Sequence, residues 1–109
     1  MKTLKIAGDL EYQVGKNAVE NWKLLDEAKP KNIFFHLSSF PSCYVILKCE
    51  SDPDMEIIKE CALACKENTK YKNLKDIKVD YTTCDNVIKG EKVGEVYYCS
   101  NRKVKQIKI

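Results

Sequence analysis

The side chains most able to do chemistry gather in one short stretch of the sequence, residues 33–48. Two apolar runs of strand length flank a loop rich in Ser and Pro, and His36, the only histidine of the chain, stands where the first run ends. An imidazole beside the hydroxyl groups of Ser38, Ser39 and Ser42 offers a hydrogen-bond donor and an acceptor, which suits a polar ligand. The other interpretation is that His36 is a hydrogen-bonded residue at the edge of the core that holds the loop in place.

A catalytic role is the weaker alternative for this stretch. His36 and Cys43 could form a nucleophilic pair across the turn, because an imidazole can activate a neighbouring thiol, but no acidic residue is evident to orient the imidazole. The sequence also has no glycine-rich phosphate loop, no paired-histidine motif and no nucleophile elbow. We therefore expect a domain that binds without catalysing a reaction.

The six cysteines are predicted to be free thiols that serve as small core residues. Cys61 and Cys65 stand four apart with apolar neighbours, and the other four are scattered among strand-like runs. A zinc site would need paired Cys-x-x-Cys motifs or a histidine pair, and the chain has one histidine. Neither a secretory signal nor an Asn-x-Ser/Thr acceptor points to an oxidising compartment. We expect no metal and no cofactor.

Positive charge is concentrated in the second half of the chain. Residues 1–55 carry seven lysines and eight acidic residues, whereas residues 56–109 carry twelve basic and eight acidic residues. Between Lys66 and Lys78 only Glu67 and Asp76 are acidic. This segment is either a phosphate-contacting patch or a solvated lysine-rich face. The lysines that we expect to contact phosphate are Lys70, Lys72, Lys75 and Lys78.

Two further groups of side chains are suited to a nucleic acid. Lys16, Asn17 and Asn21 surround the start of the first predicted helix, where free backbone amides favour anions. The alternatives are a helix cap for Asn17 and an exposed helix position for Asn21. Tyr81 and Thr82, at a strand end, could stack on a base and hydrogen-bond a sugar, although Tyr81 is equally well explained as a core aromatic.

Hydrophobic periodicity and turn residues predict the elements that position these side chains. Strands at 3–6 and 10–14 should form a hairpin around residues 7–9, and two strands should flank the loop after His36. Further strands are expected at 77–81, 96–99 and 104–109, the last with a bulge or a short pairing because Val104 is out of step with Ile107 and Ile109.

Two helices are expected between these strands. The first begins at an Asn17 cap, faces the core with Val19, Trp22 and Leu25, and ends before Pro30. The second opens at residues 51–54, with Pro53 in its first turn, and runs to about Asn68. Its apolar stripe is expected to consist of Ile57, Ile58, Cys61, Ala64 and Cys65.

The length of 109 residues predicts one domain that spans residues 1–109. The sequence has no long uncharged apolar run, so we expect neither a signal peptide nor a membrane helix, and a cytoplasmic location.

Several short motifs, taken in order, extend from about Tyr12 to the last strand. They are Gly15-Lys16-Asn17, Asn21, Phe34-Phe35-His36-Leu37, Pro41-Ser42-Cys43-Tyr44-Val45, Val79-Asp80-Tyr81-Thr82 and Gly94-Glu95-Val96-Tyr97-Tyr98. Together they resemble the RNA-binding domain of the NFACT proteins. The segment 60–79 looks most like the short eukaryotic branch of that family, named as coiled-coil-domain-containing proteins.

The resemblance implies RNA binding in translation or ribosome quality control. Large members of the family carry this domain as the C-terminal module of factors that engage the large ribosomal subunit and tRNA; here we expect a standalone domain. The sequence departs from the family at two positions. Phe34 stands where a tryptophan is usual, and Tyr44 stands where a histidine is common, so any role that needs both histidines is lost.

We therefore predict a non-catalytic α+β domain, a mostly antiparallel sheet with two helices on one side, that binds structured RNA such as tRNA or ribosomal RNA. The large ribosomal subunit is a further expected contact. Two alternatives remain: an adaptor that docks on a ribosomal or other protein, and a DNA-binding domain that uses the same basic surface. The expected contacts are Lys16, Asn17, Asn21, His36, Ser42, Lys70, Lys72, Lys75, Lys78, Tyr81 and Thr82.

Overall fold

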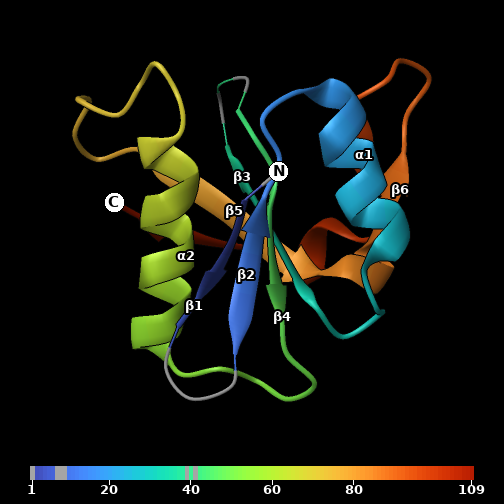
Figure 1. Cartoon of the computed structure of the whole chain (residues 1–109), viewed down its shortest axis with the longest axis horizontal. Helices are drawn as coiled ribbons and strands as arrows, with labels where there is room; N and C mark the ends of the chain where they lie inside the picture. The colour runs from blue at the N-terminus through green and yellow to red at the C-terminus, as the bar shows by residue number, and fades with distance from the viewer. Residues whose placement is uncertain (1, 7–9, 39, 41) are drawn as a thin grey trace.

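The computed structural model describes residues 2–6, 10–38, 40 and 42–109. Its helices and strands are β1 (Lys2–Lys5), β2 (Glu11–Val14), α1 (Ala18–Glu27), β3 (Ile33–Leu37), β4 (Val45–Lys48), α2 (Met55–Glu67), β5 (Lys78–Thr83), β6 (Val87–Lys89), β7 (Val96–Tyr98) and β8 (Lys105–Lys108). Single turns of 3₁₀-helix at Cys84–Asn86 and Asn101–Lys103 lie just before β6 and β8. The predicted α+β class is confirmed (Figure 1).

Six strands form one sheet in the order β1-β2-β4-β3-β5-β8, and the strand pairs that the structure describes are antiparallel. The predicted hairpin is confirmed by the pairing of β1 with β2, while its turn, residues 7–9, lies outside the described residues. Strand β6 was not predicted from the sequence. This strand pairs with β7 in a separate two-stranded sheet, so β7 and β8 belong to different sheets.

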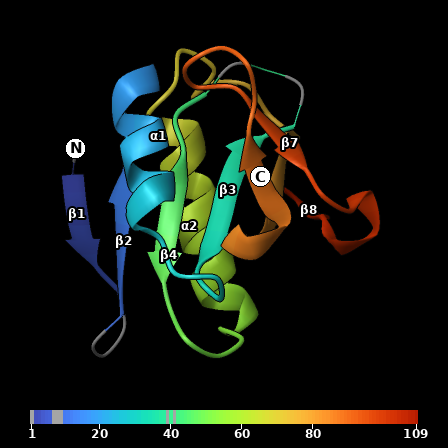
Figure 2. The same cartoon turned by 90° about the vertical axis from the view of Figure 1, so that its right-hand side faces the viewer.

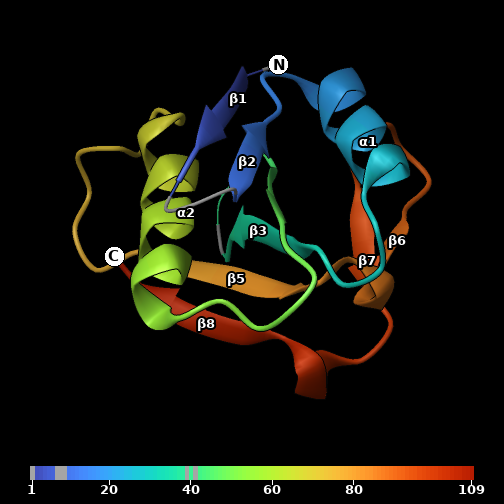
Figure 3. The same cartoon turned by 60° about the horizontal axis from the view of Figure 1, so that its bottom comes forward.

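The two helices cover opposite faces of the sheet, which corrects the prediction that they lie on one side. Phe35 and Leu37 of β3 pack in one core cluster with Ile58 and Cys61 of α2. Phe34 points to the other face, where it packs in a second cluster with residues of α1, β4 and the 87–98 hairpin. Figure 2 and Figure 3 show the sheet between α2 and α1, with β6 and β7 beside α1. Because both faces are covered, β3 and β4 are apolar at successive positions.

Both helices begin at side-chain caps. In α1 the Asn17 carboxamide oxygen accepts from the Glu20 backbone N–H at 2.9 Å, so the predicted cap is confirmed. Of the core-facing residues predicted for α1, Trp22 and Leu25 do pack against the core, but Val19 is 70% exposed. Asn21 and Leu24 are the buried residues of this helix. The α2 stripe is largely as predicted. The cap of α2 is Asp54, which accepts from the Ile57 N–H, so Pro53 precedes the helix instead of lying in its first turn.

Strand β8 is short, and its four residues pair with β5, so a short pairing is the correct one of the two predicted alternatives. All six cysteines are free; Cys99 is exposed and is therefore not the core residue that was expected. No helix among the described residues is long and apolar enough to cross a membrane. The described residues also form no cluster of three or more metal-ligating side chains.

Candidate nucleic-acid interface

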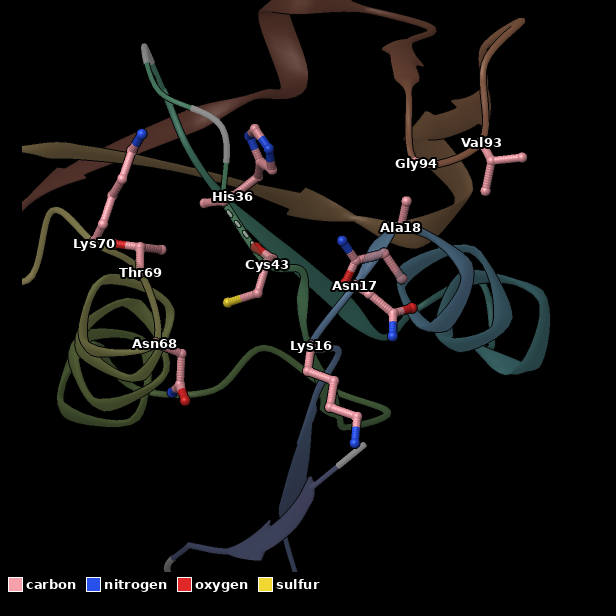
Figure 4. A pocket seen from close by; sticks show the side chains of 12 residues that line it. Lys16, Asn17, Ala18, His36, Cys43, Asn68, Thr69, Lys70, Val93 and Gly94 are labelled. Atoms are coloured by element: carbon pink, nitrogen blue, oxygen red, sulfur yellow. Dashed lines mark hydrogen bonds between the residues drawn. The ribbon is translucent and has the colours of Figure 1, made fainter.

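A cavity of about 520 Å³ opens where the start of α1, the loop between β3 and β4 and the end of α2 meet. Figure 4 shows Lys16, Asn17 and Ala18 on the α1 side and Lys70 with its neighbours on the α2 side, with His36 and Cys43 between them. The residues that line it are Lys16, Asn17, Ala18, Asn21, His36, Ser42, Cys43, Asn68, Thr69, Lys70, Val93 and Gly94. Six of the predicted contact residues therefore meet in one place.

The side of the cavity at the start of α1 carries the ammonium group of Lys16 and the carboxamide of Asn17. Asn17 uses its carboxamide oxygen as the helix cap, and the residue is exposed and lines the cavity. The Lys16 backbone N–H donates to the Glu20 carboxylate at 3.2 Å, which closes the first turn from the other side. The exposed Lys16 side chain thus stands on a fixed backbone beside the cavity.

Asn21 has a structural role that the sequence analysis did not foresee. It is 6% exposed, and its carboxamide oxygen accepts from the Tyr44 backbone N–H at 3.1 Å. This bond ties α1 to the start of β4 across the cavity floor. The neighbouring Gly15 is needed because a Cβ atom there would collide with the Asn21 side chain. Asn21 is therefore an inward-facing helix residue and not an exposed one.

His36 packs at the edge of the core and also lines the cavity. Its ring is half-buried, stacked parallel to Phe34 at 6.2 Å between centroids and edge-on to Tyr44 at 5.6 Å, and it lines the cavity. Burial lowers the pKa of His36 below 6.5, although a hydrogen bond to the Leu37 backbone and the Asp80 charge act in the other direction. The imidazole is thus neutral at pH 7, where it offers a donor and an acceptor instead of a charge.

Ser42 is the residue that holds the loop. Its hydroxyl accepts from the Leu37 N–H at 3.0 Å and donates to the Cys43 carbonyl at 2.9 Å. With both functions of the hydroxyl in use, Ser42 shapes the cavity and has little capacity left for a ligand.

The 87–98 hairpin forms the remaining edge of the cavity. The Trp22 indole N–H donates to the Glu95 carbonyl at 3.0 Å, and the Tyr44 hydroxyl donates to the Gly94 carbonyl. Gly94 has a φ of +91°, and a Cβ atom there would collide with the Ala18 side chain. Asn68, Thr69 and Gly94 line the cavity but were not predicted as site residues. For Asn68 and Thr69, the available signal in the sequence was the predicted helix end near Asn68. For Gly94, it was a glycine at a turn.

The predicted lysine patch continues from this cavity but lies outside it, apart from Lys70. Lys72 and Lys75 are exposed on the segment after α2, and Lys78 is exposed at the start of β5. The Lys70 ammonium lies 5.4 Å from the centroid of the Tyr71 ring. Of the four lysines, Lys70 therefore lines the cavity, and the other three are exposed on the chain that follows it.

Tyr81 and Thr82 are not brought to this cavity. Tyr81 stacks on Phe35 at 5.8 Å between ring centroids, on the α2 face of the sheet. Thr82 is 4% exposed, and its hydroxyl donates to the Lys103 carbonyl at 3.0 Å while it accepts from the Asn86 amide at 3.1 Å. Both residues line a second cavity of about 380 Å³, beside Met55 and Lys105.

Comparison with known proteins shows the family to which the chain belongs. The model of the NFACT protein RNA binding domain matches residues 8–98. This chain belongs to that family. The resemblance drawn from the sequence is therefore confirmed, and the cavity is formed largely by its motifs.

Individual relatives of this NFACT RNA-binding domain differ in length. The chain is 31% identical over 107 residues to the Rqc2 homolog RqcH of Bacillus subtilis. The aligned region covers 95% of this chain and 19% of that protein. It is 30% identical over 111 residues to the coiled-coil domain-containing protein 25 homolog of Dictyostelium discoideum. Here the aligned region covers 92% of this chain and 53% of that protein. The chain thus spans about half or less of the length of these relatives.

A solved structure confirms the fold. The C-terminal part of the fibronectin/fibrinogen-binding protein of Streptococcus suis superposes with a TM-score of 0.87 at 26% identity, over 98% of this chain and 43% of the other.

Proposed function

We propose that this NFACT domain binds RNA without catalysing a reaction, through the surface centred on the cavity between α1 and α2. The observation that carries the proposal is the placement of Lys16 and Lys70 on opposite walls of one polar cavity, with further exposed lysines leading away from it. Lysines supply electrostatic affinity for the phosphate backbone, and the neutral His36 and the Asn17 amide supply directed hydrogen bonds.

The partner we propose is structured RNA, tRNA or ribosomal RNA, in the cytoplasm and in a translation or ribosome-quality-control setting. The family name and the similarity to the Rqc2 homolog RqcH support this setting. A cavity bordered by a basic edge fits an RNA in which a helix backbone adjoins an unpaired nucleotide, because unpaired bases can be splayed into a pocket.

Fluorescence anisotropy with labelled tRNA tests the proposal. The double substitution Lys16→Gln with Lys70→Gln should weaken binding strongly. The matched control, Lys23→Gln with Lys59→Gln, removes two exposed lysines that lie within α1 and α2, away from the cavity, and should weaken binding much less. Equal losses in the two variants would mean that the cavity has no special part in binding.

The two alternatives predict different results in the same assay. An adaptor that docks on a protein should show weak RNA binding with no difference between the two double variants. A DNA-binding domain should bind a matched single-stranded DNA as tightly as the RNA, since only RNA offers the 2′-hydroxyl group.

A further inference from the structure

Two cysteines from different elements touch at the floor of the cavity. Cys43 precedes β4, and Cys65 lies in the last turn of α2. The Cys43 thiol lies 3.6 Å from the Cys65 carbonyl oxygen, and the Cys65 thiol lies 3.5 Å from the Cys43 carbonyl oxygen. Each thiol thus donates to the backbone carbonyl of the other residue, which places the two side chains next to each other. Figure 4 shows the sulfur of Cys43 directed toward α2.

The two thiols differ in access and in acidity. Cys43 is half-buried and lines the cavity, whereas Cys65 has no exposed surface. The hydrogen bond from Cys65 lowers the pKa of Cys43, while the same interaction and burial raise the pKa of Cys65. Cys43 therefore ionises first and is open to a small solute, and Cys65 can be reached only through Cys43.

The other cysteines lack this combination. Cys61 and Cys84 are buried, and burial raises the pKa of each to about 12. Burial likewise raises the pKa of Cys49. Cys99 is exposed and lies outside the cavity. Cys43 is thus the cysteine that pairs an open path to solvent with a neighbouring thiol.

We propose that Cys43 is a site of oxidation by peroxides, that Cys65 resolves the product to a disulfide, and that this disulfide regulates binding at the cavity. The regulatory part rests on the proposed RNA-binding function, whereas the modification itself does not.

The chemistry needs hydrogen peroxide as the oxidant and consumes one molecule of it. The Cys43 thiolate attacks one peroxide oxygen, the O–O bond breaks, and the hydroxide that leaves takes up the proton lost by the thiol to form water. The resulting sulfenic acid is attacked by the sulfur of Cys65. The S–O bond then breaks, a second water forms with the proton of Cys65, and the S–S bond remains.

The disulfide would tie the segment before β4 to the last turn of α2, at the floor of the cavity. Its sulfur atoms must approach to about 2.05 Å, which is closer than two thiols in contact. The Ser42 hydroxyl lies 3.7 Å from the Cys65 sulfur and holds the Leu37 N–H, so the loop beside His36 must shift with Cys43. We expect the oxidised protein to bind RNA about fivefold or more weakly, which is in the range of ordinary coupling between two sites.

Peptide mapping tests the modification without any RNA. The full chain carrying Cys99→Ser is treated with hydrogen peroxide, unfolded in the presence of an alkylating reagent, digested and analysed by mass spectrometry. We expect a linked pair of peptides that contain Cys43 and Cys65 and that separate on reduction. Recovery of Cys43 as an alkylated free thiol would overturn the proposal.

A trapping experiment tests the order of the two steps. With Cys65→Ser added, dimedone should label Cys43 as the sulfenic acid. If this variant does not fold, dimedone added to the Cys99→Ser protein during oxidation should compete with Cys65 and label the same residue. Labelling at Cys65 in that experiment would contradict the assigned order.

Anisotropy with labelled tRNA tests the regulation. The mapped, oxidised Cys99→Ser protein should bind more weakly than the reduced protein and should recover on reduction. Unchanged affinity of the fully linked protein would overturn the regulatory part. Absence of RNA binding by the reduced protein would instead overturn the proposed function and the regulation with it, while the peptide map still decides the modification.

Discussion

His36 has two physical roles, and one substitution can separate them. Its ring fills space against Phe34 and Tyr44, which contributes to stability, and its edge lines the cavity, where it can meet a ligand. A side chain that only packs affects the fraction of folded molecules. A side chain that contacts RNA also affects the affinity of each folded molecule.

Replacement of His36 by Asn should therefore lower both quantities. Loss of the ring contacts should reduce the free energy of unfolding by about 1–3 kcal/mol, measured by denaturant titration. Affinity for tRNA, measured on the same preparation and corrected for the folded fraction, should also fall. Unaltered affinity per folded molecule would remove His36 from the interface and leave its packing role.

The pH dependence of the free energy of unfolding should also reveal the protonation of His36. Because burial lowers the pKa of His36 in the folded state, the unfolded chain takes up a proton first as the pH falls through 6.5. The stability contributed by the neutral ring is thus fully present above pH 6.5. It is lost as the pH falls from 6.5 through the lower pKa of the folded state. Unfolding titrations between pH 5 and pH 7.5 should show wild type losing stability relative to His36→Asn toward the acidic end. A constant difference between the two proteins would contradict a lowered pKa.

The residues that were predicted to contact RNA could be named from the sequence, but the bonds they make within the fold could not. His36, at the end of an apolar run, and Ser42, in the serine-rich loop, both line the cavity. The hydroxyl of Ser42 and the carboxamide of Asn21 are used within the fold, at the Leu37 and Tyr44 backbone N–H groups. These bonds connect segments distant in sequence or cross a turn, so no local pattern could indicate them.

At the scale of elements, the start of α1 both caps a helix and forms a wall of the cavity. Asn17→Ala removes the cap and should lower the free energy of unfolding by about 1 kcal/mol, whereas Asn17→Ser keeps a capping oxygen and should be close to wild type. Both changes remove the amide NH₂ group. If that group contacts RNA, both variants should bind tRNA more weakly to a similar degree. Normal affinity of Asn17→Ser would assign Asn17 to the cap alone.

The placement of α1 and α2 on opposite faces could have been inferred from the strands. A sheet with one wet face alternates apolar and polar residues, whereas Ile33, Phe34 and Phe35 are all buried, as are Val45, Ile46 and Leu47. These unbroken runs indicate that both faces are covered. The strand β6 gave no comparable signal, since it is three residues long and Ile88 and Lys89 are exposed.

At the scale of the whole molecule, the net charge of +3 matters less than its distribution. The start of α1 and the end of α2 lie on different sides of the sheet and border the same cavity, with His36 and Cys43 between them. Lys16, from the nearly neutral first half of the chain, and Lys70, from the lysine-rich segment of the second half, both line this cavity. Folding thus brings basic residues from two stretches of sequence to one cavity.

This arrangement predicts how binding responds to salt. When a lysine that contacts a phosphate is removed, the slope of log affinity against log salt should become shallower by roughly 0.7 to 0.9. The triple change Lys70→Gln, Lys72→Gln and Lys75→Gln should therefore reduce the slope of tRNA binding about two units or more if all three lysines contact phosphate. A control with Lys29→Gln, Lys31→Gln and Lys59→Gln removes the same charge from exposed positions away from the cavity and should leave the slope near that of wild type. An unchanged slope in the first variant would show that this segment is only a solvated face, and it would contradict the part that we propose for Lys70 at the cavity.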